Sequence, residues 1–168
     1  MWTGTKDESG SSLSRGKDRS STSPSPADET IGERVHILVI EDNSADVLLI
    51  RRAIKGSHIN ADIRVLNDGA QAMRAFDAYD TDPLLPFPAL VILDINLPKK
   101  LGGEVLSHLR KAKWGSQVPV IAVSTSDSQK DRDAMEKFGA NAYFHKPSEV
   151  SGFMKLGAIV KFVLKIEE

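Results

Sequence analysis

VILDINLP, residues 91–98, joins a run of apolar strand formers to an aspartate and then to a turn that ends in proline. Val91, Ile92 and Leu93 predict a strand buried on both faces, because such strands read as continuous aliphatic runs. Asp94 stands where that strand ends. A buried carboxylate needs a polar or charged partner, so we expect Asp94 to belong to a functional site.

The chain around this strand alternates short β-branched runs with longer amphipathic segments. That alternation predicts a parallel sheet wrapped by helices, with five strands and five helices in an α/β, doubly wound arrangement. We expect strands at 35–40, 62–66, 89–94, 118–123 and 142–145, and helices at 45–55, 70–79, 103–113, 129–138 and 150–166. Ser44 is the expected cap of the first helix, and the three prolines of YDTDPLLPFP predict a long loop after the second.

Residues 1–33 are dense in Ser, Gly, Pro and mixed charge, and they hold few side chains that could be buried. Folding could not offset the loss of conformational entropy there, so we expect a disordered tail. The remaining residues, 34–168, are expected to form one domain. That size suits a chain of 168 residues, of which 40% are hydrophobic and 27% charged.

The composition also excludes several classes of protein. There are no cysteines, so disulfide frameworks, thiolate zinc sites and cysteine nucleophiles are ruled out, and a cytoplasmic location is expected. A net charge of -1 without a basic run argues against binding to nucleic acid or an anionic membrane. The apolar runs are too short to span a bilayer.

Polar side chains follow several of the predicted strands. Glu41 and Asp42 come after the first strand, Asp94 ends the third, Ser124 follows the fourth, and Lys146 follows the fifth. In open α/β sheets, ligands bind beyond the carboxyl ends of the strands, where the strand order reverses. We therefore expect these side chains to converge at one edge of the sheet.

Three carboxylates in one place repel one another unless a cation neutralises them, and Mg²⁺ is the cation that suits oxygen ligands of this kind. We expect Glu41, Asp42, Asp94 and a backbone carbonyl near Asn96 to hold it. Lys146 has no use in a pure metal site, so its presence predicts that an anion such as a phosphoryl group comes between the two cations. Asp94 would then be the nucleophile that accepts the phosphoryl group.

These residues resemble, in identity, order and spacing, the receiver domain of bacterial response regulators in two-component signalling, over about residues 35–166. The resemblance implies a flavodoxin-like sheet of strand order 2-1-3-4-5 and a sensor histidine kinase as partner. It also implies that Asp94 is phosphorylated, that Lys146 and Ser124 contact the phosphoryl group, and that Ser124 and Tyr143 act as the switch. Such a protein catalyses only its own phosphorylation and dephosphorylation and is not otherwise an enzyme.

The long YDTDPLLPFP loop and the LPKK sequence at 97–100 look most like single-domain regulators that serve phytochrome-type histidine kinases, including bacteriophytochromes. Two departures from the family pattern are mild. Glu41 is one methylene longer than the aspartate often found there, and Ser124 lacks the methyl group of threonine. Both leave the functional group in place, while metal affinity and switching efficiency stay open.

Three other functions compete with this interpretation. A nucleotide- or flavin-binding module needs a phosphate cradle after the first strand, where VIEDNSAD has two acids instead. A Mg²⁺-dependent aspartyl phosphatase needs a second aspartate two residues after the nucleophile, where this chain has Asn96. A phosphorylation-independent, receiver-like interaction module would require a geometric defect that the sequence does not reveal.

The sequence ends soon after the last predicted helix, so output through protein contacts is expected. That helix, 150–166, has more apolar surface than packing on a sheet requires, since Phe162 and Ile166 lie away from its inward face. We expect a homodimer or kinase contact there, on a surface formed by the fourth helix, fifth strand and fifth helix that changes on phosphorylation.

Overall fold

The computed structural model describes residues 33–167, so the predicted tail lies outside the described residues apart from Glu33. The strands are β2 (Val35–Ile40), β3 (Ala61–Leu66), β4 (Leu90–Asp94), β5 (Val120–Ser124) and β6 (Ala142–His145). The α-helices are α2 (Ser44–Gly56), α3 (Gly69–Thr81), α4 (Gly102–Lys111), α5 (Gln129–Lys137) and α6 (Lys155–Leu164). Two short 3₁₀ segments, η4 (Trp114–Ser116) and η5 (Val150–Met154), complete the described elements.

The five strands form one parallel sheet in the order β3-β2-β4-β5-β6. Counted from the first strand, this is the predicted order 2-1-3-4-5, and the predicted fold class is confirmed. β4 lies in the middle of the sheet, and all five of its residues are buried. The continuous aliphatic sequence of β4 follows from this position, because side chains on both faces of a central strand meet helices.

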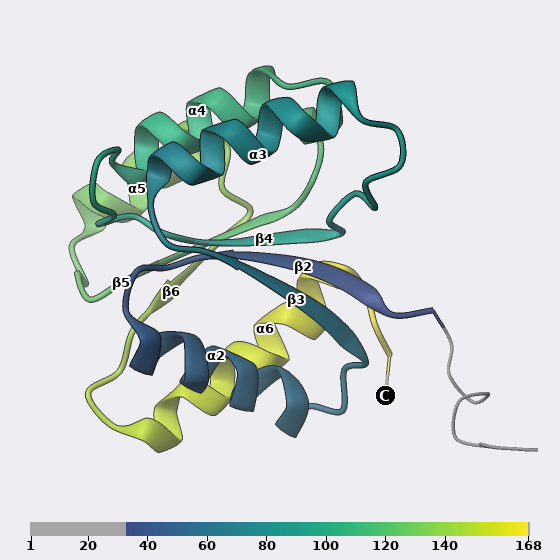
Figure 1. Ribbon diagram of the computed structural model, residues 1–168. Coiled ribbons are helices and arrows are strands. Elements are labelled where there is room, and N and C mark those ends of the chain that lie inside the picture. The colour runs from purple at the N-terminus through teal and green to yellow at the C-terminus, as the bar shows by residue number, and fades with distance from the viewer. Residues whose placement is uncertain (1–32, 168) are drawn as a thin grey trace, which may run out of the picture. The chain divides into compact units, whose positions relative to one another are not determined.

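Helices cover both faces of the sheet (Figure 1). α2 and α6 lie on one face, and α3 and α4 lie on the other, with α5 beyond them. Each face has its own hydrophobic cluster, one centred on residues such as Phe76 and Leu106 and the other on residues such as Ile50 and Leu156. The two clusters fix the sheet between the helices, so the carboxyl ends of its strands are held on a rigid frame.

The start of α2 differs from the sequence prediction. Asn43, not Ser44, caps the helix, and its side-chain oxygen accepts hydrogen bonds from the backbone N–H groups of Ala45 at 2.9 Å and Asp46 at 3.2 Å. Ser44 is already the first helical residue. Asn and Ser are both good caps, so local preference did not distinguish the two neighbours. The prediction that Ser44 is the cap was wrong.

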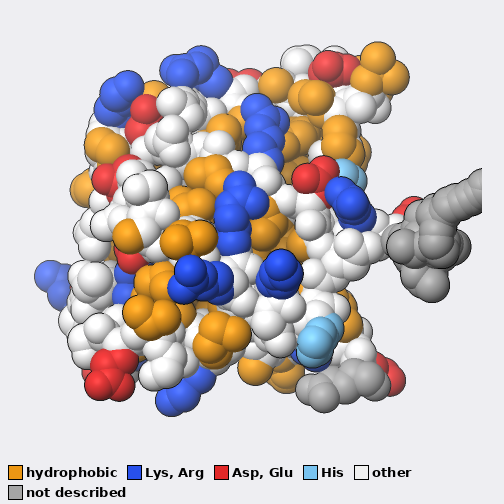
Figure 2. Space-filling view, turned by 60° about the horizontal axis from the view of Figure 1, so that its bottom comes forward, with side chains coloured by type: hydrophobic (Ala, Val, Ile, Leu, Met, Phe, Trp, Pro, Cys, Tyr) orange, Lys and Arg blue, Asp and Glu red, His pale blue; other side chains and the backbone are white. Residues whose placement is uncertain are grey.

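The last predicted helix is two elements rather than one. η5 holds the first five residues in 3₁₀ form, α6 follows, and Lys165 ends the helix in the left-handed conformation with φ at 59°. Phe162 is 84% exposed, whereas Ile166 is partly buried against the cluster beneath α6. Figure 2, in which the side of the sheet that carries α2 and α6 is turned forward, shows hydrophobic side chains interspersed with Lys and Arg. The homodimer contact expected at Phe162 and Ile166 stays a prediction.

Arg110, near the end of α4, ties together three segments that are distant in sequence. Its guanidinium donates hydrogen bonds to the backbone oxygens of Gly115 and Val118, both at 2.7 Å, and of Gly139 at 2.6 Å. A further bond, at 3.1 Å, reaches Oδ1 of Asn141. The same amide oxygen accepts a bond from the first residue of β5. Arg110 therefore fixes the loops that lead into β5 and β6.

Among the residues that the structure describes, no helix combines the length and the apolar character needed to cross a membrane.

Candidate functional site

Three loops meet at the carboxyl edge of the sheet, where β2 and β4 lie side by side and the strand order reverses. Glu41 directly follows β2, Asp94 is the last residue of β4, and Lys146 directly follows β6. The backbone N–H of Lys146 donates to the carbonyl oxygen of Ser124 at 2.7 Å. This bond extends the β5–β6 pairing and fixes the position of the Lys146 backbone. The structure thus brings these predicted residues to one edge of the sheet.

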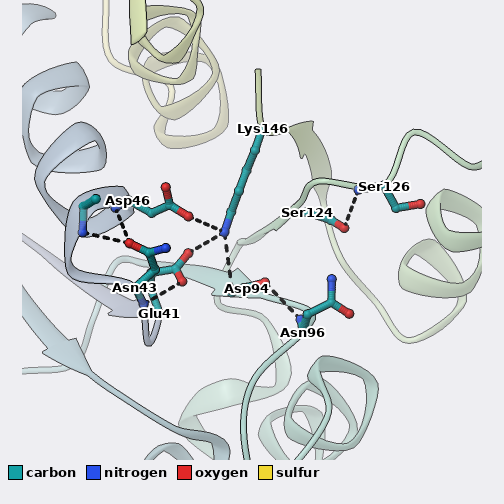
Figure 3. Close-up of polar contacts among 9 residues, drawn as sticks. Glu41, Asn43, Asp46, Asp94, Asn96, Ser124, Ser126 and Lys146 are labelled. Atoms are coloured by element: carbon teal, nitrogen blue, oxygen red, sulfur yellow. Dashed lines mark hydrogen bonds and ion pairs between the residues drawn. The ribbon is translucent and has the colours of Figure 1, made fainter. Parts of the chain in front are cut away.

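Lys146 reaches into a group of acids (Figure 3). Its Nζ lies 2.8 Å from Glu41 Oε2, 2.8 Å from Asp46 Oδ2 and 3.4 Å from Asp94 Oδ2. The Lys146 side chain is only 8% exposed, and that of Glu41 is 1% exposed. A buried ammonium needs such compensation, because removing it from water without anionic partners is very unfavourable.

The pKa values of two groups in this cluster are displaced from their ordinary range. Burial, together with the neighbouring Asp94 carboxylate, raises the pKa of Glu41 to about 7, although the contact with Lys146 opposes the change. Burial alone would lower the pKa of Lys146, but hydrogen bonds to Asp46 and Glu41 and the charge of Asp94 outweigh it, so this pKa lies above its ordinary value. Lys146 is therefore charged throughout the physiological range.

The acids of this edge fit a divalent cation. Glu41, Asp42 and Asp94 each offer a carboxylate oxygen, and these oxygens lie within 4.8 Å of one another. Opposite ligands of Mg²⁺ are about 4 Å apart, so small side-chain rotations would complete an octahedral set with water. Asp42 is exposed, which leaves one side of the cluster open to solvent. All three carboxylates predicted as metal ligands are thus together.

Asp94 is oriented by its own turn. Its Oδ1 accepts a hydrogen bond from the backbone N–H of Asn96 at 2.9 Å, while its Oδ2 faces Lys146. The backbone N–H of Ile95 donates to Val123 at 3.1 Å and so continues the β4–β5 pairing past the aspartate. The predicted metal contact of the carbonyl near Asn96 stays a prediction.

Ser124 and Tyr143, the predicted switch residues, are connected through the loop after β5. Ser124 is fully buried, and its Oγ accepts a hydrogen bond from the backbone N–H of Ser126 at 3.0 Å. The hydroxyl of Tyr143 donates to the carbonyl oxygen of Ser126 at 2.9 Å. The guanidinium carbon of Arg132 lies 4.7 Å from the centre of the Tyr143 ring. Ser126 therefore links the two predicted switch side chains.

Asp46 is a site residue that the sequence analysis missed. It lies in the first turn of α2, where an acid is readily explained by the helix dipole alone. The signal that could have found it is its position four residues after Asp42, in the first turn of a helix that begins at the carboxyl edge of the sheet. Its contact with Lys146 depends on a residue from the far end of the chain, which no local pattern shows.

The raised pKa of Glu41 predicts how stability depends on pH in the absence of a divalent cation. The folded state holds a proton on Glu41 up to about pH 7, whereas the unfolded state releases it near 4.5. Stability must therefore fall as pH rises between these two values, and we expect a loss of about 2 kcal/mol, allowing for screening. Urea unfolding at pH 5 and pH 8 in a chelating buffer measures the difference.

Glu41→Gln is the control for this pH dependence, because it keeps the shape of the side chain and removes its titration. The variant should lose most of the difference between pH 5 and pH 8, and Mg²⁺ should restore stability to the wild-type protein at pH 8. A wild-type protein that gains stability over this pH range, with Glu41→Gln behaving identically, would contradict the prediction.

Comparison with known proteins places these residues in a wider context. Residues 37–156 match the family model described as the response regulator receiver domain. The response regulator Rcp1 of Synechocystis sp. is 32% identical over 120 residues, which cover 71% of this chain and 82% of the relative.

Solved structures agree with this match. The phosphorylated cyanobacterial phytochrome response regulator RcpA superposes with a TM-score of 0.72 at 29% identity, covering 81% of this chain and 98% of that one. The Mn²⁺-bound form of Rcp1 superposes with a TM-score of 0.69 at 31% identity, covering 80% and 97%.

Proposed function

Because the chain belongs to the response regulator receiver domain family, we propose that it accepts a phosphoryl group on Asp94 from a sensor histidine kinase. The observation that carries this proposal is the placement of Asp94 Oδ2 beside the Lys146 ammonium, 3.4 Å away, at an edge that also holds two further acids able to bind a cation. Phosphoryl transfer requires a nucleophilic carboxylate, a positively charged side chain beside the transferred group, and a binding site for a metal ion.

The transfer exchanges one bond to phosphorus for another. A carboxylate oxygen of Asp94 forms the new O–P bond while the P–N bond of the kinase phosphohistidine breaks, and the electron pair stays on the imidazole nitrogen, which takes up a proton. The hydrogen bond from the Asn96 N–H to Asp94 Oδ1 holds the carboxylate in place. Lys146 neutralises charge on the phosphoryl oxygens, which lowers the barrier to transfer.

The carboxylates of this chain would suit a divalent cation. Glu41, Asp42 and Asp94 would hold Mg²⁺ or a similar divalent cation, together with the predicted carbonyl near Asn96. When bound, the cation neutralises the charge that develops on the transferring oxygens. The Mn²⁺-bound form of the relative Rcp1 supports the binding of a divalent cation, and we propose Mg²⁺ for this chain.

Ser124 and Tyr143 are proposed to report the modification to the surface. A phosphoryl oxygen on Asp94 would offer the proton of the Ser124 hydroxyl a charged acceptor, and that bond would be stronger than the present neutral one, in which Ser124 Oγ accepts from the Ser126 backbone N–H. Rotation of Ser124 toward the phosphoryl group would take its Oγ away from the Ser126 N–H, and the backbone at Ser126, whose carbonyl oxygen accepts from the Tyr143 hydroxyl, would then rearrange. The affected surface is formed by α5, β6 and α6.

The relatives favour a phytochrome-type histidine kinase as the partner. RcpA is a phytochrome response regulator by its own description, and a structural neighbour from R. palustris with a TM-score of 0.69 acts in red light signalling. We therefore propose a light-sensing kinase upstream of this chain, in the cytoplasm, and protein contacts, not nucleic acid or membrane, as its output. The homodimer is part of the same proposal, with Phe162 as its exposed apolar residue.

Intact-mass spectrometry tests the phosphoryl acceptor. Incubation with Mg²⁺ and acetyl phosphate should add the mass of one phosphoryl group to the wild-type protein and none to Asp94→Asn, because the amide is not a nucleophile for phosphorus. The matched control is Asp127→Asn, which removes an exposed acid of the β5–α5 loop and should leave the adduct intact.

Two outcomes would contradict the proposal. An adduct that persists in Asp94→Asn would place the phosphoryl group elsewhere. A folded wild-type protein that binds Mg²⁺ but forms no adduct with acetyl phosphate or a phosphorylated kinase would favour a phosphorylation-independent interaction module.

A further inference from the structure

We propose that Asp46 is a positioning residue of this site: its carboxylate holds the ammonium group of Lys146, so that Glu41 can bind a divalent cation while Lys146 stays beside Asp94. The proposal rests on the proposed function, since it assumes a metal and a phosphoryl acceptor at this edge of the sheet.

The ammonium group of Lys146 has a partner for each of its donors. It carries three N–H groups, and three carboxylates lie within 3.4 Å of Nζ. The contacts to Glu41 and Asp46 are equally short, at 2.8 Å, and that to Asp94 is longer. Two acids therefore anchor the lysine, and Asp94 receives its third donor.

The two anchors differ in what else they do. Glu41 belongs to the carboxylate cluster that fits a divalent cation, and Asp46 lies outside that cluster. Both oxygens of Glu41 already have partners, since Oε1 accepts a bond from the backbone N–H of Asn43 at 3.1 Å and Oε2 faces Lys146. A divalent cation at Oε2 would repel the ammonium there, because two positive charges at one oxygen are unfavourable. Metal binding through this oxygen would therefore weaken one anchor.

Asp46 is positioned to keep its contact with Lys146 when a cation binds Glu41. Its backbone N–H donates to the capping oxygen of Asn43 at 3.2 Å, which fixes the first turn of α2 beside Glu41. Its side chain is 21% exposed, whereas that of Glu41 is 1% exposed, and the two carboxylates face Lys146 side by side (Figure 3). One short cap thus places both anchors, and Lys146 can leave Glu41 without leaving the site.

Removing the charge of Asp46 should weaken metal binding. In Asp46→Asn the amide has the same shape but attracts the ammonium far less, so Lys146 stays on Glu41 and competes with the cation. We expect the affinity for Mg²⁺ to fall about tenfold, as for the loss of other groups that position a metal ligand. Isothermal titration calorimetry with MgCl₂ measures the dissociation constant.

A double-mutant cycle separates positioning from simple attraction of the cation by a nearby negative charge. Asp46 should lower the Mg²⁺ dissociation constant only where Lys146 is present, so the tenfold effect of Asp46→Asn should shrink to less than about twofold in a Lys146→Met background. The matched control is Glu104→Gln, which removes the first-turn acid of α4, paired with Lys100, and should leave Mg²⁺ affinity unchanged.

A second measurement does not need the Lys146→Met background. The proton–nitrogen NMR signal of the Lys146 ammonium should persist in the Mg²⁺-saturated wild-type protein, because Asp46 holds the group, and it should be lost through fast exchange in Asp46→Asn. Equal losses of Mg²⁺ affinity in both backgrounds, unchanged affinity in Asp46→Asn, or an ammonium signal unaffected by that substitution would each overturn the proposal.

These outcomes are distinguishable from a failure of the proposed function. A wild-type protein that binds no Mg²⁺ and forms no phosphoryl adduct contradicts the proposed function itself. A wild-type protein that does both, beside an Asp46→Asn variant with the same Mg²⁺ affinity, contradicts only the role of Asp46.

Discussion

Replacement of Lys146 by methionine should slow the phosphorylation of Asp94 by acetyl phosphate about a hundredfold at saturating Mg²⁺, as for the loss of other groups that stabilise charge in a transition state. Methionine has about the length of the aliphatic part of the lysine side chain and lacks the charged Nζ that faces Asp94 Oδ2. The same variant should bind Mg²⁺ at least as tightly as wild type, because no ammonium then competes for Glu41. Quantitative intact-mass time courses give the rate.

Lys137→Met is the matched control for this experiment, since it removes an exposed lysine from the last turn of α5. Its phosphorylation rate should equal that of the wild type. A Lys146→Met protein that is phosphorylated at the wild-type rate would show that the lysine serves only to neutralise the buried acids.

Replacement of Arg110 by methionine should lower the free energy of unfolding by about 3 kcal/mol, because several acceptors lose a charged donor at once. Three of these acceptors are backbone oxygens, of Gly115, Val118 and Gly139, that the guanidinium joins across the loops before β5 and β6. Methionine fills the space of the aliphatic stem but satisfies none of them. Urea unfolding followed by circular dichroism measures the change.

The control is Arg74→Met, which changes an exposed arginine on α3 and should alter the free energy of unfolding by less than about 0.5 kcal/mol. A loss in Arg110→Met no larger than in this control would mean that water replaces the guanidinium at its acceptors.

The fold was largely predictable because its central strands are buried on both faces. The sequence of β4 is aliphatic up to its last residue, Asp94, and that of β2 is aliphatic except for His36, so their limits could be placed within a residue. The ends of helices were less certain. The division of residues 150–164 into η5 and α6 was missed, since both elements bury apolar side chains at helix-like spacing and differ only in backbone hydrogen bonding.

The site was predictable where its residues follow strands directly. Parallel strands bring their carboxyl ends to one edge, so Glu41, Asp94 and Lys146 could be expected together from their positions in the chain. Asp46 could not, because its position has a sufficient local explanation at a helix start. The partner that reveals its role lies 100 residues further along the chain.

The site is assembled from distant parts of the chain, and this has a consequence for its synthesis. Glu41 and Lys146 are separated by 105 residues, and Asp94 and Lys146 by 52. Contacts of such long range form only when the sheet is nearly complete. A chain still emerging from the ribosome would carry the acceptor aspartate among acids but without its lysine. Under the proposed function, such an incomplete copy would take up the phosphoryl group far more slowly than a folded one and would divert little of it from signalling.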